Sequence, residues 1–231
     1  MARAPQSHPA DQAGPIGDTP LYTPSSYVRE QLPYWQKAAA RQAAKDAVLI
    51  PELARHFKPG SVLELGAGVG QISLLLQSSG WNVLASDYAD FFVEHMRRLG
   101  LDAHRIDATA IAASGLGPFA NIFAQSITPF ITLDYAVVRR AYESAFQALE
   151  PDGRLVLIHA MAPRRSLGAT MRIHESIAHE VGYAEVRLFR NQLLPSPAYR
   201  PPFHAAAAFA ERHLGRRYGH RFVVVARKPL R

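Results

Sequence analysis

The chain has no cysteine among its 231 residues. It therefore has no disulfide framework, no thiolate metal site and no thiol nucleophile, which excludes several classes of enzyme. It also has no run of about 20 apolar residues, the length that a membrane-spanning helix needs. The first residues, Met-Ala-Arg-Ala-Pro-Gln-Ser-His-Pro, lack the apolar core of a signal peptide. We therefore expect a cytoplasmic protein that makes no contact with membranes.

Acidic residues are scarce in the last third of the chain. Residues 151–231 hold 14 Lys or Arg against 5 Asp or Glu, whereas residues 1–150 hold 12 against 14. The net charge of +7 therefore comes from the last third. A basic patch of this kind can attract nucleic acid or an anionic substrate, and it can equally be solvated surface. The basic side chains near the end of the chain are Arg212, Arg216, Arg217, Arg221, Arg227, Lys228 and Arg231.

Length and composition favour one α/β domain with extra segments, because 48% hydrophobic residues can supply a sizeable core. Residues 1–24 are rich in proline and show no apolar periodicity, so we expect a flexible segment. Residues 25–57 have helical composition interrupted by Pro33 and Pro51, and we interpret them as a helical lid. An aromatic residue such as Trp35 could exclude water from a site or only pack the lid onto the sheet.

A short apolar run ending in alternating glycines begins the main domain, residues 58–231. Val62, Leu63 and Leu65 precede the glycines, and apolar residues 72–76 follow them, which predicts a strand, a glycine loop and a helix. This arrangement is typical of nucleotide-binding folds. The dinucleotide fingerprint G-x-G-x-x-G would need a glycine at position 71, and that residue is Gln71.

The pattern Glu64-x-Gly66-x-Gly68-x-Gly70 resembles the first motif of the class I S-adenosylmethionine-dependent methyltransferases. Two further stretches agree with that family. Asp87 follows a predicted strand at residues 81–86, 17 residues past Gly70. The stretch Leu149-Glu-Pro-Asp-Gly-Arg-Leu-Val-Leu-Ile158 resembles the family's Leu-x-Pro-Gly-Gly turn into the fifth strand, with Asp152 in place of one glycine. The resemblance covers about residues 60–228.

The resemblance implies a Rossmann-like α/β fold whose mostly parallel sheet has seven strands in the order 3-2-1-4-5-7-6, with helices on both faces. It also implies S-adenosylmethionine as the cofactor. The cofactor-binding residues that it implies are Glu64, Gly66, Ala67, Gly68, Gly70, Asp87, Tyr88, Asp107, Ala108, Gln125 and Ser126.

The roles of two acids follow from the same resemblance. Asp87 would accept hydrogen bonds from the ribose hydroxyls, and Asp107 would lie beside the adenine amino group. Alternatively, Asp87 could cap the helix that follows it, and Asp107 could cap a short helix.

Two histidines are candidates for the general base that a methyl acceptor may require when it must lose a proton. His159 directly follows the predicted fifth strand. His204 lies in a proline-rich insertion, residues 191–219, which we interpret as a specificity element or an interaction surface. His174 and His179 are five residues apart, so the second is turned roughly 140° from the first on a helix. A zinc site of the H-E-x-x-H type is therefore not expected, and we predict no metal.

We expect methyl transfer to an oxygen or nitrogen atom of a small molecule, for example in specialised metabolism. The basic last third leaves open an RNA or DNA methyltransferase, and the fold could also serve as a cofactor-binding module or a non-methylating enzyme. The segment Thr128-Pro129-Phe130 is a distant echo of the Asn/Asp/Ser-Pro-Pro-Tyr/Phe motif of amino-methylating nucleic-acid enzymes. It lacks the second proline, so we interpret it as a substrate-side loop.

Overall fold

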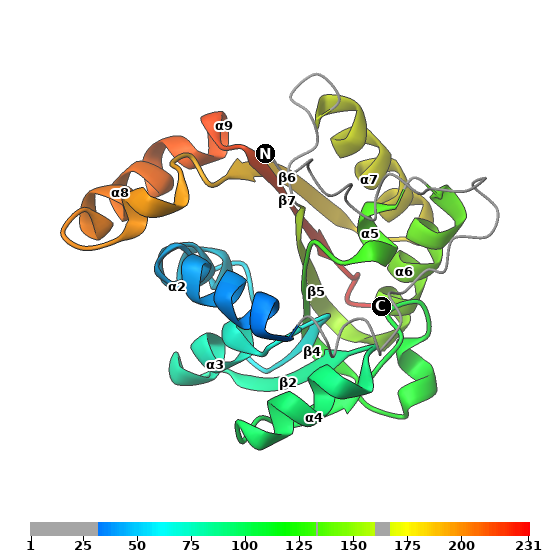
Figure 1. Cartoon of the computed structure of the whole chain (residues 1–231). Helices are drawn as coiled ribbons and strands as arrows, with labels where there is room; N and C mark the ends of the chain where they lie inside the picture. Colours follow the sequence, from blue (N-terminus) through cyan, green and yellow to red (C-terminus); the bar gives the residue numbers. More distant parts are fainter. Residues whose placement is uncertain (1–31, 133, 160–166) are drawn as a thin grey trace, which may run out of the picture.

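One seven-stranded sheet with helices on both faces makes up the computed structural model (Figure 1). The structure describes residues 32–132, 134–159 and 167–231. The strand order is β3-β2-β1-β4-β5-β7-β6, which confirms the fold class that the resemblance implied. The strands are β1 (Ser61–Leu65), β2 (Asn82–Asp87), β3 (Ala103–Arg105), β4 (Phe119–Gln125), β5 (Leu149–His159), β6 (Glu185–Asn191) and β7 (Arg221–Arg227).

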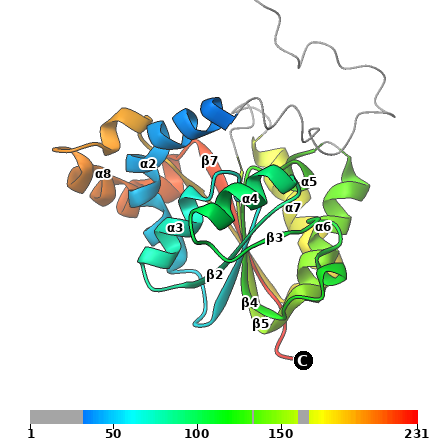
Figure 2. The same cartoon turned by 60° about the horizontal axis from the view of Figure 1, so that its bottom comes forward.

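The helices lie in two layers, one on each face of the sheet, as Figure 2 shows. One layer holds α2 (Leu32–Ala54), α3 (Gln71–Ser78) and α4 (Asp90–Arg98). The other holds the 3-10 turn η2 (Ile111–Ser114), α5 (Thr128–Ile131), α6 (Tyr135–Ala148) and α7 (Leu167–Val181). The insertion between β6 and β7 forms η3 (Ser196–Tyr199), α8 (His204–Ala210), a π-helical turn η4 (Glu211–Gly215) and α9 (Arg216–Tyr218). None of the described helices is long and apolar enough to cross a membrane.

Alternation along the strands explains the two layers. In β1, Leu63 packs with the buried Tyr142 of α6, whereas Val62 packs with Leu53 of α2 on the opposite face. Both faces of the central strands are thus buried, as expected where helices cover a parallel sheet on both sides.

Strand direction brings three strand ends together. β1 pairs in parallel with β2 and β4, and β4 pairs in parallel with β5, whereas β7 is antiparallel to both β5 and β6. The carboxyl ends of β1, β2 and β4 therefore meet at one edge of the sheet. Ligands of open α/β sheets bind at this edge.

The predicted interruption of the helix at Pro51 is wrong, whereas the one at Pro33 stays a prediction because the residues before Leu32 lie outside the described part of the chain. α2 is one helix from Leu32 to Ala54 that contains Pro51. Pro33 lies in its first turn, where a missing N–H costs no helical hydrogen bond, and Pro51 lies in its last turn. The predicted flexible segment at residues 1–24 and the expected start of the lid at residue 25 lie outside the described residues.

The predicted turn before the fifth strand occurs inside β5. Asp152, which stands where the family has glycine, has a φ of 62°. Asp tolerates this left-handed conformation better than most residues. The pairing of β4 with β5 shifts register at the same place, between Phe119 and Asn121, so the turn behaves as an irregularity within a continuous strand.

Candidate functional site

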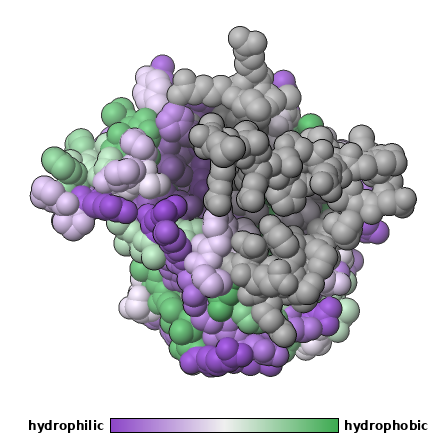
Figure 3. Space-filling model, in the orientation of Figure 1, coloured by the Kyte–Doolittle hydropathy of each residue, from purple (hydrophilic) through white to green (hydrophobic). Residues whose placement is uncertain are grey.

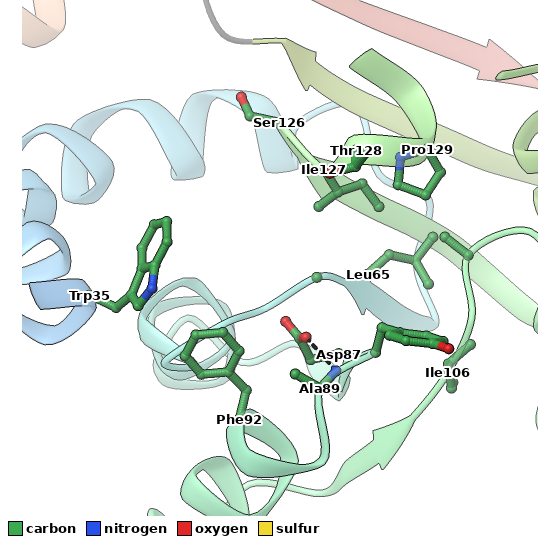
Figure 4. Close-up of a pocket in the computed structure, with 13 residues that line it drawn as sticks. Trp35, Leu65, Asp87, Ala89, Phe92, Ile106, Ser126, Ile127, Thr128 and Pro129 are labelled. Carbon is green, nitrogen blue, oxygen red and sulfur yellow. Dashed lines mark hydrogen bonds between the residues drawn. The ribbon is translucent and has the colours of Figure 1, made fainter. Parts of the chain in front are cut away.

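A pocket of about 190 Å³ lies at the carboxyl ends of β1, β2 and β4, below the first turns of α2. Figure 4 shows Trp35 from α2 and Phe92 from α4 on one side of it, and Ile127 and Pro129 on the other. The residues that line it are Trp35, Leu65, Gly66, Asp87, Tyr88, Ala89, Phe92, Ile106, Ala108, Ser126, Ile127, Thr128 and Pro129.

Asp87, the last residue of β2, places its carboxylate at this pocket (Figure 4). One carboxylate oxygen accepts a hydrogen bond from the N–H of Ala89 at 2.9 Å, and the other accepts one from the N–H of Gly68 at 3.0 Å. Burial raises the pKa of Asp87, while these backbone donors act in the opposite direction. Each carboxylate oxygen retains acceptor capacity for a ligand hydroxyl, because a carboxylate has about four lone-pair sites.

The glycine loop leaves room beside this carboxylate. Gly66 has a φ of 67°, and a Cβ on it would overlap Cγ2 of Ile127. Gly68 has a φ of 56°, and a Cβ on it would meet no atom within 4 Å. The loop therefore has one glycine that packing requires and one that faces open space, where a ligand can approach the backbone closely.

The walls of the pocket are mostly apolar. Leu65, Ile106 and Ala108 are buried, and Trp35 at the mouth is 43% exposed. The guanidinium of Arg105 lies 5.0 Å from the centroid of the Tyr88 ring, which fixes that ring beside Asp87. An apolar slot with an acid at its base suits a nucleoside, whose ring is apolar on its faces and whose sugar carries hydroxyls.

Glu64 lies behind the loop, where it contacts the helix that follows. Its carboxylate is 2% exposed and accepts a hydrogen bond from the hydroxyl of Ser73 at 2.5 Å. Burial raises the pKa of Glu64 to about 7, and the nearby carboxylates of Asp46 and Asp87 act in the same direction. Glu64 thus ties β1 to α3 in this structure, and its predicted contact with a cofactor stays a prediction.

The structure brings five of the predicted cofactor residues into the pocket wall: Gly66, Asp87, Tyr88, Ala108 and Ser126. Gly68 reaches the pocket through its bond to Asp87. Ala67, Gly70, Asp107 and Gln125 flank the wall without lining it. The Asp107 carboxylate accepts hydrogen bonds from the N–H and hydroxyl of Thr109, at 2.8 and 2.7 Å. These positions leave the assigned roles as predictions.

Ser126 has an unusual backbone conformation at the carboxyl end of β4. Its φ is 55°, a region that residues other than glycine rarely adopt. Its N–H donates to the carbonyl of Ile158 at 2.8 Å, which holds the turn against β5. Such strain often occurs at functional sites.

The sequence did not identify Ala89, Ile106 or Ile127 as parts of the pocket. All three are apolar or small residues one or two positions beyond the end of β2, β3 or β4, and nothing in their type distinguishes them from core residues. They form part of the pocket wall only because the folded sheet brings these strand ends together.

His159, a predicted base, is 2% exposed and points into the layer of α7. Its ring stacks on Phe222, with centroids 4.2 Å apart, and lies 4.3 Å from the ring of His174. Within residues 32–132, 134–159 and 167–231, neither ring nitrogen of His159 has a hydrogen-bond partner. Burial, and then the neighbouring His174, lowers the pKa of His159 well below its ordinary value. The ring is therefore neutral near pH 7, and its role as a base stays a prediction.

His174 is buried, and its Nδ1 lies 2.9 Å from the hydroxyl of Tyr142. Burial lowers the pKa of His174 to about 4. His179 is exposed. His204, the other predicted base, is also exposed, at the start of α8, and lines none of the described pockets. Within the described ranges, no three His, Asp or Glu side chains are grouped to hold a metal ion.

Buried polar side chains attach α2 to the glycine loop. Asp46 accepts a hydrogen bond from Nε2 of Gln71, the first residue of α3, at 3.0 Å. The ammonium of Lys45 lies 3.3 Å from Asp46, and both side chains are buried. This contact positions the helix that carries Trp35 over the pocket.

No family model and no curated protein matches this chain. Solved structures match its fold. An S-adenosylmethionine-dependent methyltransferase from Thermotoga maritima has a TM-score of 0.61 at 13% identity, over 87% of this chain and 99% of that one. A TehB-like S-adenosylmethionine-dependent methyltransferase from Corynebacterium glutamicum has a TM-score of 0.58 at 18% identity, over 89% and 100%.

A glycopeptide N-methyltransferase is a further match, with a TM-score of 0.50 at 19% identity, over 81% of this chain and 90% of that one. At such identities a likeness establishes the fold alone. Together with the strand order, it shows that this chain has the fold of the class I S-adenosylmethionine-dependent methyltransferases.

Proposed function

We propose that this protein transfers a methyl group from S-adenosylmethionine to an oxygen or nitrogen atom of a small-molecule acceptor. The observation that carries the proposal is Asp87, whose carboxylate stands at the end of β2 beside the open space at Gly68. In this arrangement Asp87 would hold the ribose hydroxyls, and Leu65, Ile106 and Ala108 would enclose the adenosine.

The chain's own residues would position the reactants. When bound, the cofactor supplies a methyl group on a sulfonium sulfur, so that an acceptor atom can bond to the methyl carbon while the carbon–sulfur bond breaks and the neutral thioether leaves, without a metal. Trp35 and Phe92 would exclude water from the pocket, and the segment from Ser126 to Pro129 would form the side that faces the acceptor. Orientation of this kind can be worth about 7–11 kcal/mol of a barrier.

A base is required only for an acceptor that loses a proton. His159 is our first candidate, because it follows Ile158 directly, next to the Ser126 turn, and its ring nitrogens have no partner among the described residues. His204 is the second candidate. If His159 is the base, His159→Ala lowers turnover by about 10²–10⁴-fold, and unchanged turnover across pH 6–9 would remove it from the mechanism.

The acceptor class is the less supported half of the proposal. Among proteins of this fold, one matched structure is a methyltransferase of glycopeptide nitrogen, so the fold accommodates acceptors larger than a metabolite. We favour a small molecule, for example one of specialised metabolism in the cytoplasm, because the pocket has a volume of about 190 Å³ and most of the residues that line it are apolar.

Calorimetric titration with S-adenosylmethionine tests the proposal. We expect saturable binding by the wild-type chain and at least about tenfold weaker binding by Asp87→Ala, because hydrogen bonds to a charged group contribute about 1.5–3 kcal/mol. Asp90→Ala is the matched control, since Asp90 is an exposed acid three residues away that does not line the pocket. Absence of binding by the wild-type chain would contradict the proposal.

A further inference from the structure

A second pocket, of about 160 Å³, lies between the last turns of α2 and the insertion that follows β6. Its walls come from residues 49–56, the end of β6 and the π-helical turn η4. We call it the arginine groove. Leu49, the first α2 residue that lines it, lies about 20 Å along the helix axis from Trp35. The arginine groove shares no lining residue with the pocket that contains Asp87, which we call the Asp87 pocket. π-helical turns are rare and occur often at functional sites.

The groove has an excess of positive charge. Four arginines, Arg55, Arg190, Arg212 and Arg216, line it together with two acids, Glu52 and Glu211. In Figure 3, the left of the molecule, where Figure 1 places α2 beside α8, shows purple hydrophilic residues among pale and green ones.

Both acids of the groove are already engaged. Glu52 lies 2.7 Å from Nη2 of Arg212 and 3.2 Å from Nη1 of Arg55. Glu211 accepts hydrogen bonds from the N–H of Leu193 at 2.5 Å and from the hydroxyl of Tyr199. Arg216 therefore lines the groove with no carboxylate partner among the described residues, and Arg212 shares the single carboxylate of Glu52 with Arg55. Arg190 alternates with Phe189 and Asn191 along β6, so its side chain points to the opposite face of the sheet, where Phe222 lies.

Arg216 is held in place without an acid. Its guanidinium lies 5.2 Å from the centroid of the Phe189 ring, and its Nη2 lies 3.5 Å from Nε2 of His56. Burial lowers the pKa of His56 to about 4, and the charge of Arg216 adds to this. His56 is thus neutral near pH 7 and leaves the positive charge on the guanidinium, whose five donors are fixed in a planar fork.

Asn191 completes the groove with a buried amide. It is the last residue of β6, it is 7% exposed, and neither its Oδ1 nor its Nδ2 has a hydrogen-bond partner among the residues that the structure describes. A buried amide without partners costs about 1–3 kcal/mol. Such a group at the wall of a basic pocket is explained by a ligand that would accept its hydrogen bond.

We propose that the arginine groove is a second ligand site, which binds a phosphate group through Arg216 and Arg212, with Nδ2 of Asn191 as a third donor. Arg212 and Arg216 are four residues apart in one helical segment, so both guanidinium groups lie on its face toward α2. A phosphate monoester carries a charge of about −1.5 to −2 near pH 7 and three acceptor oxygens, which match the excess of arginines over acids in the lining and its three donors. A carboxylate carries only one negative charge and would match this excess less well. The phosphate can belong to a small phosphorylated compound or to a nucleic-acid backbone.

Calorimetric titration of the full chain with inorganic phosphate at low salt tests the site. We expect saturable binding by the wild-type chain and at least about tenfold weaker binding by the double variant Arg212→Gln/Arg216→Gln. Arg217→Gln is the matched control, because this neighbouring guanidinium lies over Tyr218 and does not line the groove. We expect the control to bind phosphate within about twofold of the wild type, because solvent and salt screen an exposed charge that lies outside the groove. Asn191→Asp keeps the shape of the side chain but removes the donor, and we expect similarly weak binding.

Absence of saturable phosphate binding, or an equal loss in Arg217→Gln, would overturn the site. Wild-type affinity in Asn191→Asp would overturn the assignment of the third donor. Unchanged binding of S-adenosylmethionine by the double variant would confirm that it is folded and that the two sites are separate, whereas loss of that binding too would overturn their separation.

A single-stranded oligonucleotide distinguishes the two sources of phosphate. If it binds more tightly than inorganic phosphate and the double variant loses this binding, with a shallower dependence on salt, the groove contacts a nucleic-acid backbone. If it binds no more tightly than inorganic phosphate, the ligand is a small phosphorylated compound. Both outcomes support the phosphate site.

Discussion

Single residues determine whether a ligand can reach the end of β1. Gly66 and Gly68 both have positive φ, yet only Gly66 is constrained by a neighbouring side chain, that of Ile127. Gly68 borders open space and donates its N–H to Asp87. The two glycines therefore have different physical roles, one in packing and one in access.

Gly68→Ala separates these roles. We expect it to lower the free energy of unfolding by about 1–2 kcal/mol, the cost of a left-handed conformation for a residue with a Cβ. Cofactor binding should weaken by at least about tenfold, because the new methyl group enters the space beside Asp87. Chemical denaturation and calorimetry measure the two effects.

Gly115→Ala is the control for Gly68→Ala. Gly115 has a φ of 71° and no atom within 4 Å of its would-be Cβ, but it lies outside the pocket. We expect the same loss of stability with unchanged binding. Equal binding by both variants would mean that the space at Gly68 is not used by the cofactor.

His159 offers a second prediction at this scale. His159→Phe removes two buried nitrogens that have no partner and keeps the ring stacked on Phe222. We expect it to raise the free energy of unfolding by about 1–2 kcal/mol at pH 7. Burial lowers the pKa of His159 in the folded state below the value of about 6.5 that it has in the unfolded chain. Below about pH 6.5 the unfolded chain therefore binds a proton that folded His159 does not, and the free energy of unfolding of the wild type decreases as the pH falls.

The stability advantage of His159→Phe should therefore grow as the pH falls below about 6.5. Denaturant unfolding at several pH values measures this. His179→Phe, at an exposed position of the same layer, is the control and should show no such trend. A variant less stable than the wild type at every pH would indicate that the nitrogens of His159 have favourable contacts outside the described residues.

At the scale of elements, α2 links the two pockets. Its first turns carry Trp35 over the Asp87 pocket, and its last turns line the arginine groove (Figure 1). Between them, Lys45 and Asp46 are buried, and Asp46 holds Gln71 at the start of α3. The position of this helix depends on a buried ion pair rather than on apolar packing alone.

Asp46→Asn tests this attachment. It leaves the ammonium of Lys45, which is 1% exposed, without its carboxylate, and breaking a buried pair in this way costs about 3–5 kcal/mol. The double variant Lys45→Met/Asp46→Leu removes both charges, so we expect it to be more stable than the single variant. Denaturant unfolding of both variants checks the order. A cost below about 1 kcal/mol for Asp46→Asn would show that the pair is not effectively buried.

At the scale of the whole molecule, the Asp87 pocket joins elements from both layers and the centre of the sheet. α2, the loops after β1 and β2, and the segment after β4 all contribute to its wall. A ligand that contacts all of them stabilises the folded state as a whole. A ligand that binds the native state but not the unfolded chain increases the free energy of unfolding.

S-adenosylmethionine at about 100 times its Kd should add about 2.7 kcal/mol to the free energy of unfolding. For a chain of this length this raises the Tm by roughly 5–10 °C. A thermal unfolding scan with and without the cofactor measures the shift. Asp87→Ala at the same concentration should show a clearly smaller one, and an equal shift in this variant would place the cofactor elsewhere.

Much of the fold was predictable because local signals agreed. The alternation of strands and helices favoured a parallel sheet. The glycines after β1 and the turn before the fifth strand carried the resemblance to a known family, and that resemblance implied the strand order. Helix α2 was harder to predict, because Pro33 and Pro51 read as breaks in the sequence while their positions in the first and last turns make them compatible with one helix. On α7, the four-residue spacing of Ile173 and Ile177 would place both on one face, but Ile173 is 48% exposed whereas Ile177 and His174 are buried.

By itself, the sequence determined the glycine loop, the acid at the end of β2 and the fold, because these depend on backbone conformation and on residues close together in the chain. Only the tertiary structure decided that Ile106 and Ile127 enclose the same pocket as Asp87, that His159 is buried, and that Asn191, Arg212 and Arg216 meet α2 in one groove. These contacts join segments far apart in the chain, so they depend on how the strands pair and how the insertion packs, which no local pattern encodes.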